Sequence, residues 1–309
     1  MDSIFKNVAV LCGGNSKERE VSLRSGAAVC KALNEAGINA EVLDIHTLNE
    51  VNENLKKYSS VFIAMHGDWG ENGELQSKLS DLKIPYTGSN PKASSNAMNK
   101  WTARELFKKA DIKIPSGVLC KENTIPDLSS LNTKDIVVKP ESGGSTVGIT
   151  IIKNYNDEKL LEAIKFARES YEGDVLIEEY IEGREITASV WENNNEIQAL
   201  PLIEIVPKVG FYDYKNKYTS GATEYIVPAK IEESISEKIQ EAAVKAHEVL
   251  GCSSYSRADL RLKSNGEFYI LEVNTAPGMT ATSLVPKAAN AIGVNMPNFV
   301  KHILSMAHL

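Results

Sequence analysis

Asp259 and Glu272 are the residues most suited to chemistry, because a predicted β-hairpin places their carboxylates opposite each other. The predicted turn is Asn265-Gly266, whose two residues tolerate the positive φ of a two-residue type I′ loop. With that loop length, Arg257 also faces Asn274. Carboxylates on directly opposed residues, with Cβ atoms about 5 Å apart, repel each other, so we expect a cation between them. Carboxylate and amide oxygens suit Mg²⁺, which makes Asp259, Glu272 and Asn274 candidate metal ligands.

The opposite face of the same hairpin is predicted to be an uninterrupted apolar ladder that packs on a core. An alternative interpretation of the polar face is that it is merely solvated, with Arg257 as the counter-ion of the carboxylates. The run Asn-Thr-Ala-Pro-Gly at 274–278 is unusual for a plain surface and favours a functional site. The residues of the predicted apolar ladder are Ala258, Leu260, Leu262, Tyr269, Leu271 and Val273.

The composition of the chain sets broad limits. Its 309 residues predict two or three domains, and its net charge of -7 argues against a nucleic-acid partner. The four cysteines form no CxxC pair, so the sequence indicates neither a zinc site nor a disulfide framework. The start resembles no signal peptide and no apolar run is long enough to span a membrane. We therefore expect a cytoplasmic protein with no membrane partner.

The elements that must position these residues begin with an α/β pattern. Short apolar strands are expected at 8–11, 40–44 and 60–65, with a helix at 21–36 after the first strand, which predicts a parallel sheet. The intervening turn, 13–16, could offer backbone amides to an anion. It lacks the G-x-G-x-x-G pattern of dinucleotide-binding proteins, so a tight structural turn explains it equally well.

A long helix is expected from about 92 to 109, and a second unit begins with it. A strand at 135–140 then delivers Lys139 beside the glycine-rich loop 141–148, where backbone N–H groups could approach phosphate oxygens. The loop is not a Walker A motif, because it contains no Gly-Lys-Ser/Thr. The pattern at 175–185 predicts a strand, a connector that could bind an adenine edge, and a second strand. Each of these motifs alone is equally consistent with a hairpin or a solvated connector.

Residues 207–221 form a different kind of segment. They are rich in tyrosine and lysine and show no sustained period. Long irregular segments in compact domains are commonly lids or linkers, and the aromatic content favours a lid that folds over a bound ligand. An amphipathic helix is predicted after it, at about 232–250, and two further helical patterns end the chain.

Together these motifs resemble those of the ATP-grasp ligases, and among them the D-alanine:D-alanine ligase family. The resemblance covers essentially the whole chain in the family's order and implies an α/β fold of three domains. These would be a parallel-sheet substrate-binding domain at 1–95 and two α+β domains, 96–182 and 183–309, whose antiparallel sheets grip ATP. The motifs that carry the resemblance are 13–22, 66–73, 139–148, 211–218, 257–259 and 272–280.

The resemblance implies an activity as well as a fold. The family joins two D-alanines in an ATP-dependent reaction that passes through an acyl phosphate and makes a peptidoglycan precursor. Two Mg²⁺ ions, replaceable by Mn²⁺, would be held by Asp259, Glu272 and Asn274 and would bridge the phosphates. The substrates would be ATP and D-alanine, and a homodimer is expected. The matching ATP-binding residues are Lys100, Lys139, Glu178, Glu179, Ile181 and Glu185.

The two amino-acid subsites also follow from the resemblance. Glu18 would receive the ammonium group of the first D-alanine, and His66 lies in the segment lining that subsite. Ser283 and Leu284, helped by Lys217, would receive the carboxylate of the second D-alanine. Each residue has a simpler explanation, for example a helix-dipole role for Glu18, a structural role for His66 and an N-cap role for Ser283.

The remaining matches concern the reacting atoms and the lid. Arg257 and the backbone N–H of Gly278 would donate to the oxyanion of the tetrahedral species. Ser145 and Tyr218 would form a hydrogen-bonded link to Glu18 that ties the lid to the closed site. Tyr218 could equally be ordinary lid packing, and Lys100 could be a solvated helix residue.

One departure and two rival functions complete the expectations. Many relatives carry lysine where Glu179 stands, so a side-chain contact to the base is not expected there, whereas backbone recognition would survive. The first rival is a sister ligase that takes D-lactate or D-serine in the second subsite, against which the presence of Tyr218 argues. The second is a nucleotide-binding sensor without turnover, against which the intact hairpin set Arg257, Asp259, Glu272 and Asn274 argues.

Overall fold

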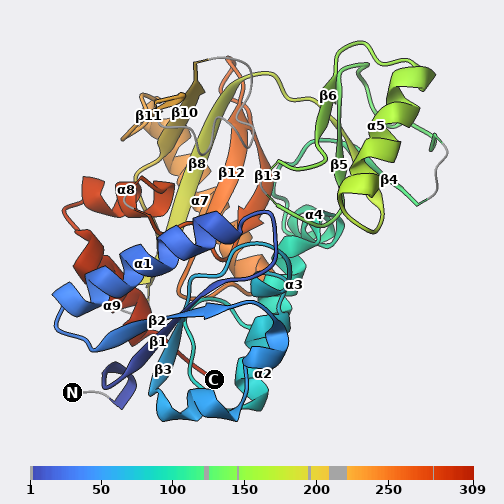
Figure 1. Ribbon diagram of the computed structural model, residues 1–309. Coiled ribbons are helices and arrows are strands. Elements are labelled where there is room, and N and C mark those ends of the chain that lie inside the picture. The colour runs from blue at the N-terminus through green and yellow to red at the C-terminus, as the bar shows by residue number, and fades with distance from the viewer. Residues whose placement is uncertain (1–2, 122–124, 145, 194–195, 209–220, 281) are drawn as a thin grey trace.

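Three β-sheets organise the residues described by the computed structural model, which are 3–121, 125–144, 146–193, 196–208, 221–280 and 282–309 (Figure 1). The strands of the first sheet are β1 (Val8–Gly13), β2 (Ala40–Ile45) and β3 (Ser60–Ile63). Those of the second are β4 (Gly117–Cys120), β5 (Ile136–Pro140), β6 (Thr150–Ile152) and β7 (Val175–Glu179). Those of the third are β8 (Arg184–Asn193), β9 (Glu196–Ala199), β10 (Ile203–Pro207), β11 (Thr223–Ile226), β12 (Tyr255–Leu262) and β13 (Phe268–Asn274).

The first sheet is parallel, with the order β2-β1-β3, and the other two sheets are antiparallel. The second has the order β4-β7-β5-β6, and the third has the order β11-β10-β8-β12-β13 with β9 beside β8. Figure 1 shows the parallel sheet and the second sheet at opposite ends of the molecule, with the third sheet between them and to one side. The expected combination of one parallel and two antiparallel sheets is therefore confirmed.

Helices cover the sheets on the faces where apolar side chains gather. The parallel sheet has one core on each face because its buried strands alternate side chains between the two faces. The helices are α1 (Arg19–Glu35), α2 (Glu74–Asp81), α3 (Pro91–Met98), α4 (Lys100–Lys109), α5 (Asp157–Ser170), α7 (Glu233–Leu250), α8 (Leu284–Ala291) and α9 (Met296–Ser305). Short 3₁₀ helices are η1 (Ser3–Phe5), η2 (Leu48–Glu50), η3 (Glu53–Lys57) and η4 (Asp68–Gly70).

The C-terminal helices return to the N-terminal sheet. Phe299 and Ile303 of α9 belong to the same buried core as Val10 of β1 and Leu33 of α1. The last residues continue this contact, because His308 forms an antiparallel bridge with Tyr86. The core of the predicted first domain thus includes residues from the end of the chain, and the proposed ranges 1–95, 96–182 and 183–309 stay a prediction.

The predicted single helix at 92–109 is wrong in one respect, because the chain leaves the helical conformation at Asn99. Its ψ of 102° is extended, and its side-chain oxygen accepts a hydrogen bond from the Thr102 backbone N–H. Asparagine competes well for this capping role, which ends α3 and starts α4. The break places Lys100 in the first turn of α4, where its backbone N–H donates to the Glu141 carbonyl at 2.9 Å.

The hairpin β12–β13 has the predicted pairing at the end that holds Asp259 and Glu272 but a different turn. Lys263 and Glu267 close a three-residue loop in which only Gly266 has positive φ, so the predicted two-residue type I′ loop is wrong. The extra loop residue shifts the pairing by one position. A β-bulge at Leu271 shifts it back, so that Asp259 still faces Glu272.

The bulge also changes which residues form the apolar face. Tyr269 and Leu271 were expected on this face, but Ile270 and Phe268 take their places opposite Leu260 and Leu262. The reason is that one inserted residue reverses the inward and outward positions along a strand. The face that packs on α7 and α4 is therefore made of Ala258, Leu260, Leu262, Phe268, Ile270 and Val273.

Candidate active site

A cavity of about 500 Å³ collects side chains from all three sheet regions. Its walls come from α1, from the loop after β3, from the start of α4, from the glycine-rich loop, and from the hairpin with the start of α8. The predicted site residues that line it are Glu18, His66, Lys100, Arg257, Glu272, Asn274, Gly278, Ser283 and Leu284.

Other predicted residues lie outside this lining. Ser145, Lys217 and Tyr218, with most of the predicted lid, fall outside the residues that the structure describes. The predicted site residues that the structure describes but that do not line this cavity are Lys139, Glu178, Glu179, Ile181, Glu185 and Asp259.

The polar face of the hairpin contains the expected pairs. Asp259 lies opposite Glu272, and Arg257 lies opposite Asn274. The Arg257 guanidinium donates two hydrogen bonds to Asp259, at 2.9 Å and 2.7 Å, and Thr187 Oγ1 donates a third to Oδ1 at 2.7 Å. The alternative role of Arg257 as a counter-ion is thus observed for one of the two carboxylates.

Glu272 has a different cation. Its Oε2 lies 3.8 Å from Nζ of Lys100, whose ammonium also donates to the Gly143 carbonyl at 2.5 Å. The Glu272 side chain remains 35% exposed, so its oxygens can reach a ligand in the cavity. Lys100 therefore joins the glycine-rich loop to the hairpin and is not a solvated helix residue.

The donor set of the hairpin fits a divalent cation that takes its remaining ligands from water or phosphate. Two opposed carboxylates and the Asn274 amide are hard oxygen donors. Asn274 Oδ1 accepts a hydrogen bond from Ala276 N at 2.8 Å, which orients the amide group. Within the described part of the chain, no group of three or more His, Cys, Asp or Glu residues could hold a metal alone, so an ion here would need substrate oxygens.

The wall opposite the hairpin carries negative charge around Glu18. Glu18 is buried at the N-cap of α1, and its side chain makes no capping hydrogen bond. Burial, with Glu18 as the next cause, raises the pKa of Tyr171 to about 12, and the same two causes raise the pKa of Asp68. A Cβ built on Gly144 would lie 3.3 Å from Glu18 Oε2, so the glycine-rich loop closely approaches this carboxylate.

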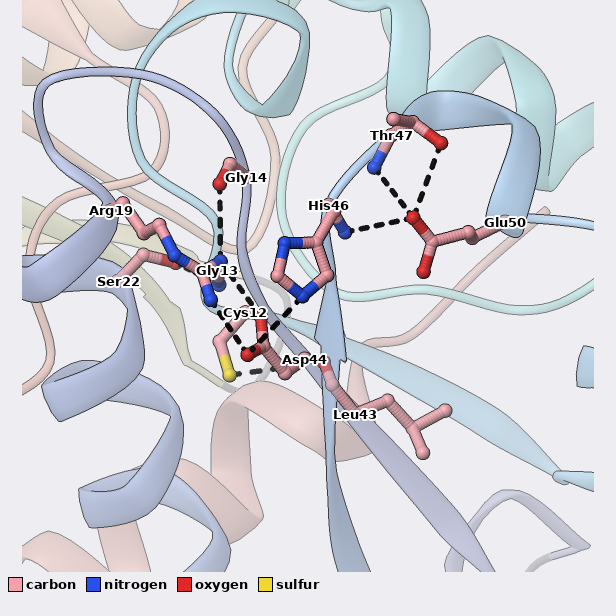
Figure 2. A network of polar contacts seen from close by, with 10 residues as sticks. All are labelled: Cys12, Gly13, Gly14, Arg19, Ser22, Leu43, Asp44, His46, Thr47 and Glu50. Atoms are coloured by element: carbon pink, nitrogen blue, oxygen red, sulfur yellow. Dashed lines mark hydrogen bonds and ion pairs between the residues drawn. The ribbon is translucent and has the colours of Figure 1, made fainter.

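The loop before Glu18 is fixed by a clamp between Arg19 and Asp44, shown in Figure 2. The guanidinium donates to both oxygens of Asp44 at 2.8 Å and to the Gly14 carbonyl at 3.1 Å. Gly13 has φ +100° and a Cβ there would lie 2.2 Å from Asp44 Oδ1, so only glycine fits. The predicted turn at 13–16 is therefore accounted for as a tight structural turn that places Glu18 in the cavity.

His66 connects three parts of the site and is 4% exposed. Its Nδ1 lies 3.1 Å from the Ala276 carbonyl, which can only accept, so this nitrogen carries the proton. Its Nε2 lies 2.9 Å from the Ser25 hydroxyl, which in turn accepts from the Met279 backbone N–H at 3.2 Å. His66 thus lines the cavity, as predicted, and holds the 276–279 loop that contains Gly278.

The start of α8 closes this end of the cavity. Ser283 is the N-cap residue, as the alternative interpretation expected, but its side chain makes no hydrogen bond to the helix. Instead Ser283 Oγ accepts from Thr280 N at 3.0 Å and lies 2.9 Å from Thr280 Oγ1. A Cβ on Gly278 would lie 3.0 Å from the same Oγ, so the glycine allows the loop and the hydroxyl to approach. Leu284 is buried beside it.

Most of the predicted nucleotide residues lie on β5, β7 and β8, whereas Lys100 begins α4 and Ile181 lies in the connector between β7 and β8. Lys139 Nζ lies 2.5 Å from Glu178 Oε2, and Glu178 also contacts Arg104, a residue that the sequence interpretation missed. Glu185 pairs across strands with Arg261 at 3.2 Å. Tyr180 N and Glu179 N donate to backbone carbonyls of neighbouring segments, so the connector is fixed by its main chain.

Two of the missed residues differ in how far the sequence could have revealed them. Arg104 lies four positions after Lys100, and helical periodicity puts both on one face of α4. Tyr171 gives no such signal. Its ring lies against Gly143, 28 positions earlier in the chain, and only the folded glycine-rich loop brings the two residues together. The cavity lining also includes Arg24, Glu71 and Lys287, none of which was predicted.

Comparison with known proteins gives a consistent result. A family profile described as "D-ala D-ala ligase C-terminus" matches residues 116–305. The D-alanine–D-alanine ligase of Desulforamulus reducens is 43% identical over 97% of this chain and 98% of its own length. The enzyme of the same name from Halalkalibacterium halodurans is 41% identical over 97% of this chain and 98% of its own length.

Solved structures show the same similarity. The Bacillus anthracis D-alanine–D-alanine ligase, complexed with ATP, has a TM-score of 0.84 at 30% identity, covering 97% of this chain and 96% of that one. The Enterococcus faecalis VanG D-Ala:D-Ser ligase has a TM-score of 0.82 at 30% identity, covering 97% and 99%. The three-sheet arrangement is thus that of the ATP-grasp ligases, as expected.

Proposed function

The chain belongs to the D-alanine–D-alanine ligase family and is an ATP-dependent ligase that joins two D-alanines for cell-wall synthesis, and we propose that the cavity between α1 and the hairpin is its active site. The observation that carries this proposal is that one cavity brings the Glu18 wall, the Arg257–Asn274 face and the Gly278–Leu284 segment together. These are the predicted parts of both amino-acid subsites and of the reacting centre.

The charge of the Glu18 wall supports its role toward the first D-alanine. Glu18 and Glu71 line the cavity, and burial together with Glu18 raises the pKa of nearby Asp68. Such a wall favours an ammonium group. We therefore propose that Glu18 binds the amino group of the first D-alanine. The carboxylate of that D-alanine would then point toward the hairpin.

The hairpin wall supports the chemical steps. In the proposed reaction the carboxylate of the first D-alanine attacks the γ-phosphate of ATP, ADP leaves, and the amine of the second D-alanine then displaces phosphate. Both steps concentrate negative charge, which Lys100 and Arg257 would stabilise. The Gly278 N–H would donate to the oxyanion of the tetrahedral species, while Ser283 would hold the second carboxylate. When bound, divalent cations held by Asp259, Glu272 and Asn274 would neutralise the phosphates.

Several finer expectations belong to the same proposal. We propose two Mg²⁺ ions, ATP contacts along Lys139, Glu178, Glu179, Ile181 and Glu185, and the predicted roles of Ser145, Lys217 and Tyr218. We also propose a homodimer and a cytoplasmic location. The four cysteines are all free thiols, which is compatible with a reducing compartment. Among the described residues, no helix is long and apolar enough to cross a membrane.

A second candidate function is a ligase that takes D-serine or D-lactate in the second subsite. Among the solved structures, a D-Ala:D-Ser ligase and a D-alanine–D-alanine ligase are equally similar to this chain, each at 30% identity. The test is phosphate release with ATP and Mg²⁺, supplying D-alanine alone or with D-serine or D-lactate, followed by the mass of the product. We expect D-alanyl-D-alanine as the main product. A main product containing D-serine or D-lactate would favour the second candidate, and absence of any ligation product would contradict the proposed function.

A further inference from the structure

Glu178 lies between two cations in the interior of the second sheet region. Its Oε1 accepts a hydrogen bond from Arg104 Nη1, and its Oε2 lies 2.5 Å from Lys139 Nζ. The side chains of Arg104, Glu178 and Lys139 are 2%, 3% and 6% exposed. The cluster therefore carries one more positive than negative charge in a buried place, where uncompensated charge is costly.

Arg104 is held independently of Lys139. Its Nη2 donates to the Pro115 carbonyl at 2.7 Å, while Nη1 binds Glu178. A Cβ on Gly117 would lie 2.8 Å from Arg104 Nη2 and 3.1 Å from Glu178 Cγ, so this glycine leaves room for the guanidinium. The planar guanidinium can make both bonds at once, which a lysine ammonium at the same place would do less well.

Lys139 stands at the end of β5, directly before the glycine-rich loop where phosphate is expected. A phosphate oxygen at this loop would compete with Glu178 for the ammonium and would draw it away from the carboxylate. Without Arg104 that movement would leave a buried carboxylate with no cation beside it. With Arg104 present, the carboxylate keeps one strong hydrogen bond, so the movement of Lys139 is much less unfavourable.

We propose that Arg104 is a positioning residue for nucleotide binding, which keeps Glu178 paired and oriented while Lys139 exchanges Glu178 for a phosphate of ATP. Arg104 need not touch the nucleotide to do so. This inference rests on the proposed function, because it takes ATP as the ligand of Lys139. It adds a residue on α4 that is coupled to the ATP subsite and not to the D-alanine subsites.

A positioning role of Arg104 predicts different effects on the KM for ATP and on the KM for D-alanine, whereas a purely structural arginine would affect both alike. Arg104→Met leaves the Glu178–Lys139 pair intact in the free protein, so that variant should fold. Glu178 is left without a neighbouring cation only when ATP draws Lys139 away, so the variant should be impaired in ATP binding. We expect the KM for ATP to rise on the order of ten- to hundredfold, the size associated with a buried hydrogen bond to a charged group. The KM for D-alanine should change less than about twofold.

The experiment compares Arg104→Met and Arg104→Lys with the wild type, measuring both KM values and the binding of a non-hydrolysable ATP analogue with Mg²⁺ by titration calorimetry. Arg104→Lys should restore part of the affinity because it keeps the charge. Lys108→Met is the matched control, since Lys108 is an exposed cation on the same helix whose ammonium contacts Glu105 and the Trp101 ring but neither Glu178 nor Lys139 in the described structure.

Unchanged nucleotide affinity in Arg104→Met would overturn the inference, and so would equal rises in the KM for ATP and for D-alanine. If Arg104→Met does not fold, Arg104→Lys decides alone, and a selective rise in the KM for ATP is required. Failure of the proposed function looks different, because the wild type itself would then make no dipeptide.

Discussion

Glu178 and Glu272 are two glutamates that each lie beside a lysine predicted to bind ATP, yet their surroundings differ. Glu178 is 3% exposed, with Lys139 at 2.5 Å and Arg104 on its other oxygen. Glu272 is 35% exposed, with Lys100 at 3.8 Å and a second carboxylate, Asp259, opposite it. One carboxylate is surrounded by cations in the interior, and the other faces a cavity and a like charge.

The difference shows how burial separates a carboxylate that the fold requires from one that is open to the cavity. Removal of the Glu178 charge would leave two buried cations without their anion, so the fold depends on it. Removal of the Glu272 charge would weaken only a 3.8 Å contact with Lys100 and would relieve repulsion with Asp259, so the fold depends on it much less. A residue that stability does not require, but that stands in the cavity, is better explained by function.

The largest expected effect is on stability. Glu178→Gln should lower the free energy of unfolding by about 3–5 kcal/mol, because Arg104 and Lys139 would remain buried without their shared carboxylate. Urea denaturation followed by circular dichroism measures this. The matched variant Glu272→Gln should leave the free energy unchanged or slightly raised. Equal losses in the two variants would break the comparison.

The next effect is on turnover and concerns Arg257. If its guanidinium stabilises charge that develops in the reaction, Arg257→Lys should lower kcat on the order of a hundredfold and change both KM values little, because lysine lacks the planar fork. If Arg257 is only the counter-ion of Asp259, kcat at saturating Mg²⁺ should be nearly normal and only the Mg²⁺ dependence should shift. Steady-state kinetics at several Mg²⁺ concentrations separate the two roles.

The smallest effect concerns a third carboxylate, Asp44, which is 40% exposed. The hydrogen bond from Arg19 lowers the pKa of Asp44. A lowered pKa in the folded state means that the pair stabilises the protein above the ordinary aspartate pKa, about 3.9, and that this stabilisation is lost as pH falls through the lowered value. Salt screening and exposure keep the contribution small.

Thermal unfolding of the wild type and of Asp44→Asn between about pH 3 and pH 7 measures this contribution. The difference between the two melting temperatures should be small and constant in the upper part of that range and should shrink toward its acid end. A difference that grows on acidification would contradict the assigned role of the Arg19–Asp44 clamp.

The sequence correctly predicted which residues share the polar face of the hairpin, although the predicted turn was wrong. Asp259, Glu272, Arg257 and Asn274 share one face because the extra loop residue and the bulge at Leu271 compensate each other. Neither irregularity has a clear sequence signal. The alternation of polar and apolar residues gave the correct pairing near Asp259. Near the turn it gave a pairing that was wrong by one residue.

Other features needed the folded structure. The break at Asn99 depends on a competition between helix continuation and side-chain capping, which periodicity alone does not resolve. The Arg104–Glu178 pair joins residues 74 positions apart, so its members could be suspected singly but not paired. The α/β class, by contrast, depends on the local alternation of apolar strands and amphipathic helices along the chain, and it was confirmed.

The most direct test of the account is the rate of Mg²⁺-dependent phosphate release for Asp259→Asn and Glu272→Gln at saturating ATP and D-alanine, with unfolding measured on the same samples. We predict that each variant loses turnover on the order of a hundredfold or more while its free energy of unfolding stays the same or rises slightly. Normal turnover in both variants, or a loss of turnover matched by a loss of stability, would contradict the assignment of this hairpin face as the catalytic wall.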